Sequence, residues 1–200
     1  MLESLRFIVK VASVLCFVVL FTGCASLYGS DPRQRLYTCD PWKGEQLVKL
    51  PGWDDAWQTV KSCSTAPPEK VSIAMKVFYL YWLETFGDRY NRVSVSMNKL
   101  MVLWGEEPRT VSGYRTDGSY GTNLSVQGMA HTKSIVWIKK DRDSRICDTS
   151  LVHELVHIAI WAGKGTDGDP DHLGSRYLGW TVNHSALVQK VNEELCRLKI

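Results

Sequence analysis

Three residues of the types that bind and activate metal ions fall within five positions of the sequence. They are His153, Glu154 and His157, in the run LVHELVH at residues 151–157. Residues four apart lie one turn apart on the same face of a helix, so both imidazoles can reach one ion. Zinc binds neutral imidazole well and lowers the pKa of a bound water molecule to about 7. The spacing therefore predicts a zinc site in which Glu154 accepts a proton from that water.

The residues around the motif predict a buried helix. Apart from His153, Glu154 and His157, all residues from 151 to 161 are Leu, Val, Ile, Ala or Trp. A helix that is apolar all round is buried. Asp148, Thr149 or Ser150 can cap its start, and we expect it to run to about Ala162 and end at Gly163. Buried polar groups without a partner cost about 1–3 kcal/mol each, so three of them in a core helix indicate a shared function.

At these residues the chain resembles the zincin metallopeptidases. The resemblance covers residues 129–200 at most and is close only over the pentapeptide 153–157. It implies an α+β, zincin-like fold: a small mixed or antiparallel sheet, an active-site helix, an N-terminal helix and a C-terminal helix. It also implies an edge strand just before the active helix, where residues 129–138 stand, along which an extended peptide would pair. By position, His153 and His157 would bind zinc and Glu154 would be the general base.

The resemblance does not identify the third zinc ligand, because the zincin subclasses differ in that residue. A metzincin needs a glycine and a histidine where this chain has Ile160 and Gly163, so that subclass is excluded. The aspzincin pattern only half matches residues 165–169, and a gluzincin would use a glutamate on a later helix. We expect His172 to be the third ligand, because its loop can return to the ion and neighbouring aspartates can orient the imidazole. The alternatives that stay open are His184, Asp169, Asp171, Glu193 and Glu194.

The cysteines give a geometric argument for His184. Cys39, Cys63, Cys147 and Cys196 allow three pairings in an oxidising compartment, of which we favour Cys39–Cys63 and Cys147–Cys196. The second bridge would join the start of the active helix to the end of the last helix, so the two would run antiparallel. His184 lies about 18 Å of helix before Cys196 and would be level with His157, whereas the late glutamates would be level with the helix start.

We therefore expect His184 to be a catalytic residue that supports a ligand or donates a hydrogen bond in the transition state. Its role and that of His172 are exchangeable at this stage. Tyr114 and Tyr177 are candidate donors to an oxyanion, and His131 is expected at the surface.

The N-terminal segment predicts export and lipidation. Arg6 and Lys10 precede residues 11–21, which are almost all apolar and too short to span a bilayer as a helix, as in a secretory signal peptide. Residues 20–24 resemble a bacterial lipobox, which implies that Cys24 is diacylated after cleavage. We expect residues 1–23 to be a lipoprotein signal peptide and 24–36 a tether. Residues 37–200 would be one zincin-like domain with an irregular, disulfide-tied lobe at about 37–66.

Other segments predict the elements that hold the site. Helical spacing of apolar residues follows Pro67 and Pro68 and stops at Gly87, and a last helix is expected over residues 183–198. Residues 100–104 and 134–138 are predicted strands, residues 90–98 could be strand or helix, and residues 113–128 are turn-rich with short strands.

Composition excludes little but agrees with this assignment. Hydrophobic residues are 44% and charged residues 22%, which is ordinary for a globular chain, and a net charge of +3 does not indicate a nucleic-acid partner. We expect a secreted zinc-dependent hydrolase of peptidase type in the bacterial cell envelope, held to the membrane by the lipid on Cys24 and acting on a peptide or protein. The alternative is a non-catalytic envelope lipoprotein whose zinc is structural or cargo, its site closed by four histidines.

Overall fold

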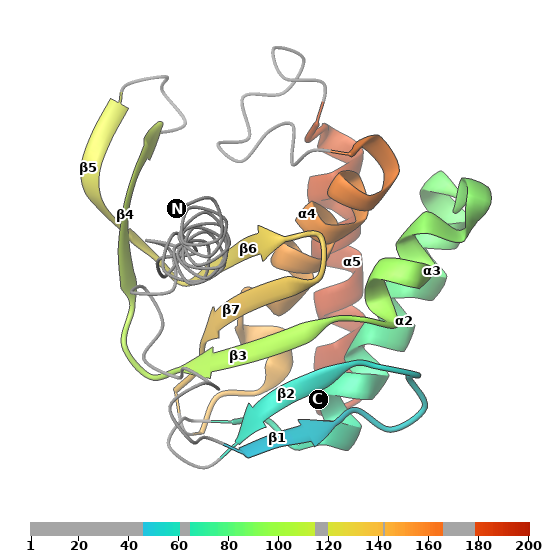
Figure 1. Ribbon diagram of the computed structural model, residues 1–200, viewed down its shortest axis with the longest axis horizontal. Helices are drawn as coiled ribbons and strands as arrows, with labels where there is room; N and C mark the ends of the chain where they lie inside the picture. Colours follow the sequence, from blue (N-terminus) through green and yellow to red (C-terminus); the bar gives the residue numbers. More distant parts are fainter. Residues whose placement is uncertain (1–45, 61–64, 115–119, 142, 166–178) are drawn as a thin grey trace, which may run out of the picture. The chain divides into compact units, whose positions relative to one another are not determined.

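A mixed sheet of five strands forms the centre of the fold in the computed structural model (Figure 1). The structure describes residues 46–60, 65–114, 120–141, 143–165 and 179–200. All of these residues belong to the unit Leu36–Ile200, one of the two units into which the chain divides. None of the helices in the described ranges is long and apolar enough to cross a membrane.

The sheet order is β1-β2-β3-β7-β6. Strands β2 (Trp57–Val60), β3 (Met101–Gly105) and β7 (Ile135–Lys139) are parallel to one another. The outer strands β1 (Gln46–Lys49) and β6 (Gly128–Thr132) run antiparallel to their neighbours. The predicted α+β class with a small mixed sheet is therefore confirmed. Residues 135–138, which were predicted to belong to the edge, lie inside the sheet, and β6 is the edge strand.

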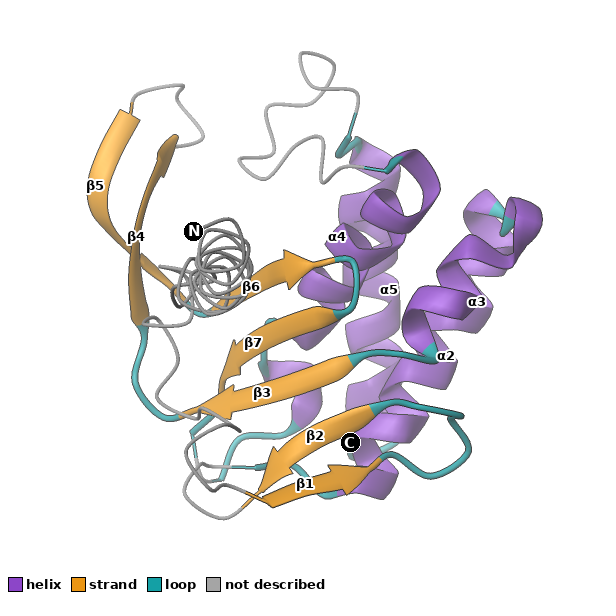
Figure 2. Cartoon of the chain, viewed as in Figure 1, coloured by secondary structure: helices purple, strands orange, loops and turns teal. Residues whose placement is uncertain are grey.

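Helices cover one face of this sheet (Figure 2). They are α2 (Pro68–Phe86), α3 (Arg92–Met97), α4 (Leu151–Lys164) and α5 (Val182–Arg197). Alternate residues of the central strands, Val102, Trp104, Val136 and Ile138, enter the same core as the helices. Because side chains alternate across a strand, Leu103 and Trp137 lie on the opposite face, where both are also buried.

Helix α2 begins and ends where the sequence predicts. Proline occupies its first turn, and Gly87 at its end has a φ of 72°, which favours glycine. Residues 92–97 are helical, which resolves the strand-or-helix ambiguity. The Asp88 carboxylate accepts hydrogen bonds from the N–H groups of Val93 (3.0 Å) and Ser94 (2.9 Å) and so caps α3.

The prediction that residues 37–66 are irregular is wrong for residues 46–60, which the structure describes. Strands β1 and β2 join the main sheet, with Trp57 opposite Met101 of β3. Each has only four residues, and Pro51 and Gly52 stand between them, so no alternation is long enough to be recognised. Cys39 and Cys63, predicted to pair here, lie outside the described residues.

A separate two-stranded hairpin precedes the edge strand. It consists of β4 (Arg109–Tyr114) and β5 (Tyr120–Val126), which are antiparallel. The guanidinium carbon of Arg109, at its base, lies 5.3 Å from the centre of the Trp137 ring. Only Gln127 separates β5 from β6. The turn-rich segment of the sequence therefore leads directly into the strand beside the motif.

Candidate metal centre

Helix α4 carries the HExxH motif through the core. It follows a short 3₁₀ turn, Ile146–Asp148, and ends at Gly165, whose φ is 86° and whose N–H donates to the Trp161 carbonyl. The predicted end at Gly163 is too early, because Gly165 rather than Gly163 provides the left-handed residue that closes the last turn. Nine of the ten residues from 151 to 160 are buried, among them Glu154 and His157.

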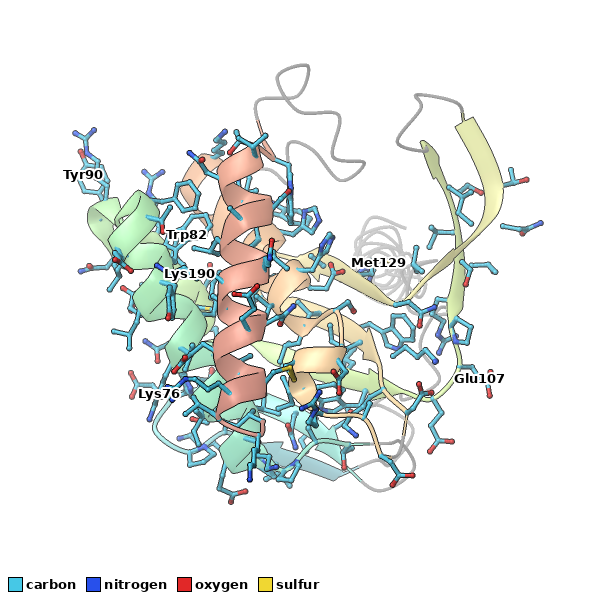
Figure 3. All side chains as sticks on the ribbon, turned by 180° about the vertical axis from the view of Figure 1, so that it is seen from behind. Lys76, Trp82, Tyr90, Glu107, Met129 and Lys190 are labelled. Carbon is cyan, nitrogen blue, oxygen red and sulfur yellow. A yellow bond between two sulfur atoms is a disulfide. The ribbon has the colours of Figure 1, made fainter. Side chains whose placement is uncertain are left out.

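The disulfide predicted between Cys147 and Cys196 is present, with the two Cα atoms 5.4 Å apart (yellow bond in Figure 3). It joins the 3₁₀ turn that precedes α4 to the last turn of α5. At the other end of the pair, His157 of α4 and His184 of α5 both contact the ring of Trp180. The two helices therefore run antiparallel, as the pairing implied, and His184 reaches the level of the motif.

The rings of His153 and His157 lie next to each other on one face of α4. Their centroids are 5.1 Å apart and their planes meet at 62°. A ring centroid lies about 3.2 Å from a zinc ion bound by one of its nitrogens, so two rings at a tetrahedral angle have centroids about 5.2 Å apart. The spacing of the two imidazoles is therefore compatible with both binding one tetrahedral ion.

Trp180 packs on both imidazoles and was not singled out from the sequence. Its ring centroid lies 4.7 Å from that of His153 and 4.9 Å from that of His157. Its Nε1–H donates to the Ser185 hydroxyl at 2.8 Å, which fixes the indole to the first turn of α5. The chain has eight tryptophans, and nothing in the local sequence distinguishes this one. Its contacts depend on how α5 folds back on α4.

His184 lies in an aromatic enclosure at the start of α5. Its ring stacks on Phe86 with centroids 4.4 Å apart, and Trp82 and Trp180 lie 5.7 and 5.9 Å away. Figure 3 shows Trp82 on α2, directed towards α5. Burial is the largest cause that lowers the pKa of His184, and with the positive charge of Lys164 and the neighbouring His157 it brings this pKa to about 4. The imidazole is therefore neutral near pH 7.

A backbone hydrogen bond selects the tautomer of His184. The Thr181 N–H donates to Nδ1 at 2.9 Å. An amide N–H can only donate, so Nδ1 carries a lone pair and the neutral ring carries its proton on Nε2. In this state Nε2 is a hydrogen-bond donor and has no lone pair for a metal. The arrangement suits the predicted donor role and not that of a ligand.

Glu154 is buried between the motif helix and the edge strand. Its side chain lies against Gly128, the first residue of β6. The Ser150 hydroxyl, at the N-cap of α4, donates to the Gln127 carbonyl at 2.8 Å and fixes the helix start to the residue before β6. Glu154 as a residue is 5% exposed, so its carboxylate is shielded from bulk solvent.

The carboxylates proposed as alternative ligands on α5 are engaged elsewhere. Glu193 accepts a hydrogen bond from Gln189 at 2.8 Å, and Glu194 pairs with Arg197, which lowers the pKa of Glu194. Both lie in the last turns of α5, near the disulfide. His131, expected at the surface, is instead 5% exposed. It belongs to the edge strand, so a position at the sheet edge does not imply exposure.

The remaining predicted site residues lie outside the described ranges: His172, Asp169, Asp171 and Tyr177, and the side chain of Tyr114. The same holds for Cys24, the signal peptide 1–23 and the tether 24–36.

Only one group of three potential metal-binding side chains lies within 4.8 Å in the described part of the chain. It consists of Cys147, Asp148 and Cys196. The two sulfur atoms are bonded to each other, and Asp148 pairs with Arg145, so this group is not a metal site. The motif helix therefore remains the candidate centre. No family model, no curated protein and no solved structure matches the chain.

Proposed function

We propose that the protein is a secreted, lipid-anchored zinc-dependent hydrolase of peptidase type with a zincin-like site. One observation carries the proposal: two imidazoles on one face of a buried helix have the spacing of a shared tetrahedral ion, with Glu154 between them in sequence. His153 and His157 would hold the zinc ion, with His172 as the third protein ligand. Cys24 would carry the lipid that anchors the chain in the bacterial envelope.

The chemistry divides between the ion and the protein. Bound zinc supplies a Lewis acid that polarises a carbonyl and lowers the pKa of water. Glu154 takes a proton from the attacking water and returns it to the leaving amine. The low exposure of Glu154 and Trp180 limits access of bulk water and strengthens these electrostatic interactions. His184 donates from Nε2 to the carbonyl oxygen as negative charge develops there.

The tautomer of His184 supports a catalytic site over a closed structural one. A structural zinc site is closed by four protein ligands, whereas a catalytic site keeps one position for water. Closing this site with histidines requires a lone pair on His184 Nε2. The hydrogen bond from Thr181 to Nδ1 leaves the proton on that nitrogen instead. Three ligands and one open position are therefore the arrangement that these contacts favour.

Metal analysis combined with one conservative substitution tests the proposal. The full chain is expressed with its own leader in a bacterial host, purified in detergent with its disulfide intact, and analysed for zinc and for hydrolysis of a peptide panel. We expect one equivalent of zinc, retained in Glu154→Gln, and hydrolysis that is lost in that variant. The matched control is Glu193→Gln, an exposed glutamate on α5, which should keep both properties.

The other outcomes are equally informative. Zinc without hydrolysis of any panel substrate, in the wild type as in Glu154→Gln, would favour a structural or cargo site. A purified wild-type chain that binds no zinc, and gains none on dialysis against it, would contradict the proposal altogether.

A further inference from the structure

We propose that Gly128 is the positioning residue of Glu154: the backbone of the edge strand forms the wall against which the carboxylate is held. The inference rests on the proposed function for its catalytic meaning. The contact itself is independent of that function. Gly128 belongs to a different element from the motif, and its role follows from the space around its Cα atom.

There is no room for a side chain at this position. A Cβ atom built on Gly128 would overlap Ser150 Oγ and would lie 2.7 Å from Glu154 Oε1 and 2.9 Å from Glu154 Cγ. All three distances are below normal van der Waals contact. The described glycines with positive φ are Gly52, Gly87 and Gly165, and Gly128 is not among them. Glycine is therefore required at 128 for the close approach of the two elements, and not for its backbone conformation.

The strand cannot move away to make room. The Gln127 carbonyl accepts a hydrogen bond from the Lys139 N–H of β7 and another from the Ser150 hydroxyl of α4, both at 2.8 Å. Gly128 itself stands opposite Ile138 in the pairing of β6 with β7. The ladder to β7 thus holds the backbone from the sheet, whether or not the Ser150 hydroxyl keeps its bond. The groups that can yield are the ends of two side chains, the Ser150 hydroxyl and the Glu154 carboxylate.

A methyl group at 128 would therefore displace the proposed general base and leave the proposed zinc ligands in place. The three atoms nearest to it all belong to Ser150 and Glu154. A misplacement of a catalytic group by about 1 Å can cost about 100-fold in rate. We expect Gly128→Ala to lower kcat by about that factor, while KM and the zinc content stay close to those of the wild type.

Gly163→Ala is the matched control, because it adds the same methyl group to α4 itself. A Cβ atom at Gly163 meets nothing within 4 Å, so zinc content and kcat should not change. Ser150→Ala separates two causes, since it removes the hydroxyl that Gly128→Ala would also displace. A loss of kcat in Ser150→Ala equal to that in Gly128→Ala would assign the effect to the hydroxyl and overturn the inference. So would wild-type kcat in a folded Gly128→Ala protein, or loss of its zinc.

A measurement on folded protein keeps the inference testable if Gly128→Ala does not fold or if the wild type is inactive. With glycine labelled by ¹⁵N, the amide resonances of Gly128 and Gly163 are compared between the full wild-type chain and Glu154→Gln. Removal of the carboxylate charge should shift the Gly128 resonance and leave Gly163 almost unmoved. A shift in an inactive wild type would mean that the proposed function fails and the contact stands. An unmoved Gly128 resonance would overturn the inference whatever the activity.

Discussion

The backbone N–H of Thr181 donates to Nδ1 of His184 over 2.9 Å, and this bond leaves Nε2 as the protonated nitrogen of a neutral ring. The donor precedes the first turn of α5, so the start of that helix determines the chemistry of a side chain three residues later. The same histidine stacks on Phe86 of α2. Two segments far apart in the sequence, the start of α5 and the end of α2, thus define one imidazole.

His184→Gln should lower hydrolysis without removing zinc. Loss of one donor to a developing oxyanion costs about 100-fold to 1,000-fold in kcat. A ligand would behave differently, because removal of His153 or His157 should abolish stoichiometric zinc binding. Zinc analysis and steady-state kinetics on the three variants distinguish the roles. Zinc loss in His184→Gln equal to that in His157→Gln would show that His184 is a ligand after all.

The tautomer is also directly observable. With histidine labelled by ¹⁵N, we expect Nδ1 of His184 to have the chemical shift of a nitrogen without a proton, and Nε2 that of a protonated nitrogen. The spectrum of the metal-free chain near pH 7 is sufficient, because the assignment depends on the bond from Thr181 and not on zinc.

Trp180→Phe should weaken zinc binding by about tenfold. The indole lies against both proposed ligand rings and is fixed by its hydrogen bond to Ser185, which phenylalanine cannot make. Groups that orient metal ligands contribute about 10-fold to 100-fold in affinity, and only part of the packing is lost here. Competition with a zinc-binding dye measures the change. Trp57→Phe is the control. Trp57 lies in β2, which two strands separate from β6 in the sheet, so this variant should retain wild-type zinc affinity.

Reduction of the Cys147–Cys196 disulfide should cost more than stability. The two residues are 49 positions apart, and a loop of that size corresponds to about 4 kcal/mol of unfolding free energy. The bridge also fixes the antiparallel pairing of α4 and α5, which brings Trp180 and His184 to the motif. We expect Cys147→Ser/Cys196→Ser to show a lower Tm and weaker zinc binding together. Unchanged zinc affinity in the folded double variant would mean that packing alone aligns the helices.

The sequence predicted the elements whose signals are local. Pro68 and Gly87 bound α2, the apolar run around His153 gives α4, and the even cysteine count led to the bridge that aligns α4 with α5. Two strands before residue 61 were missed because β1 and β2 have four residues each and depend on pairing with Met101 and its neighbours. Tertiary contact decides such short strands, and periodicity over four residues carries almost no information.

The sequence predicted the site residues that α4 itself carries, and it did not predict those that other segments bring to α4. His153, Glu154 and His157 follow from one period of one element. Trp180, Gly128 and Thr181 act through neighbours between three and 27 residues away, and the roles of Trp180 and Gly128 depend on which side of α4 each segment passes. His131 shows the same limit in the opposite direction, because the sequence places it in the edge strand and does not reveal that it is buried.

The low pKa of His184 gives a prediction for stability against pH. Its folded-state pKa is about 4 and its ordinary value is 6.5, so between these values the unfolded chain binds more protons than the folded one. Stability from the neutral ring is therefore complete above about pH 6.5 and is lost as the pH falls towards 4. The full shift corresponds to at most about 3 kcal/mol.

In metal-free protein, His184→Gln should lose less unfolding free energy than the wild type between pH 7 and 4, by about 1–3 kcal/mol. Urea unfolding at a series of pH values measures both slopes. Asn183→Gln, an exposed change beside it, should keep the wild-type slope, and an equal slope in His184→Gln would show that the ring titrates normally in the folded chain.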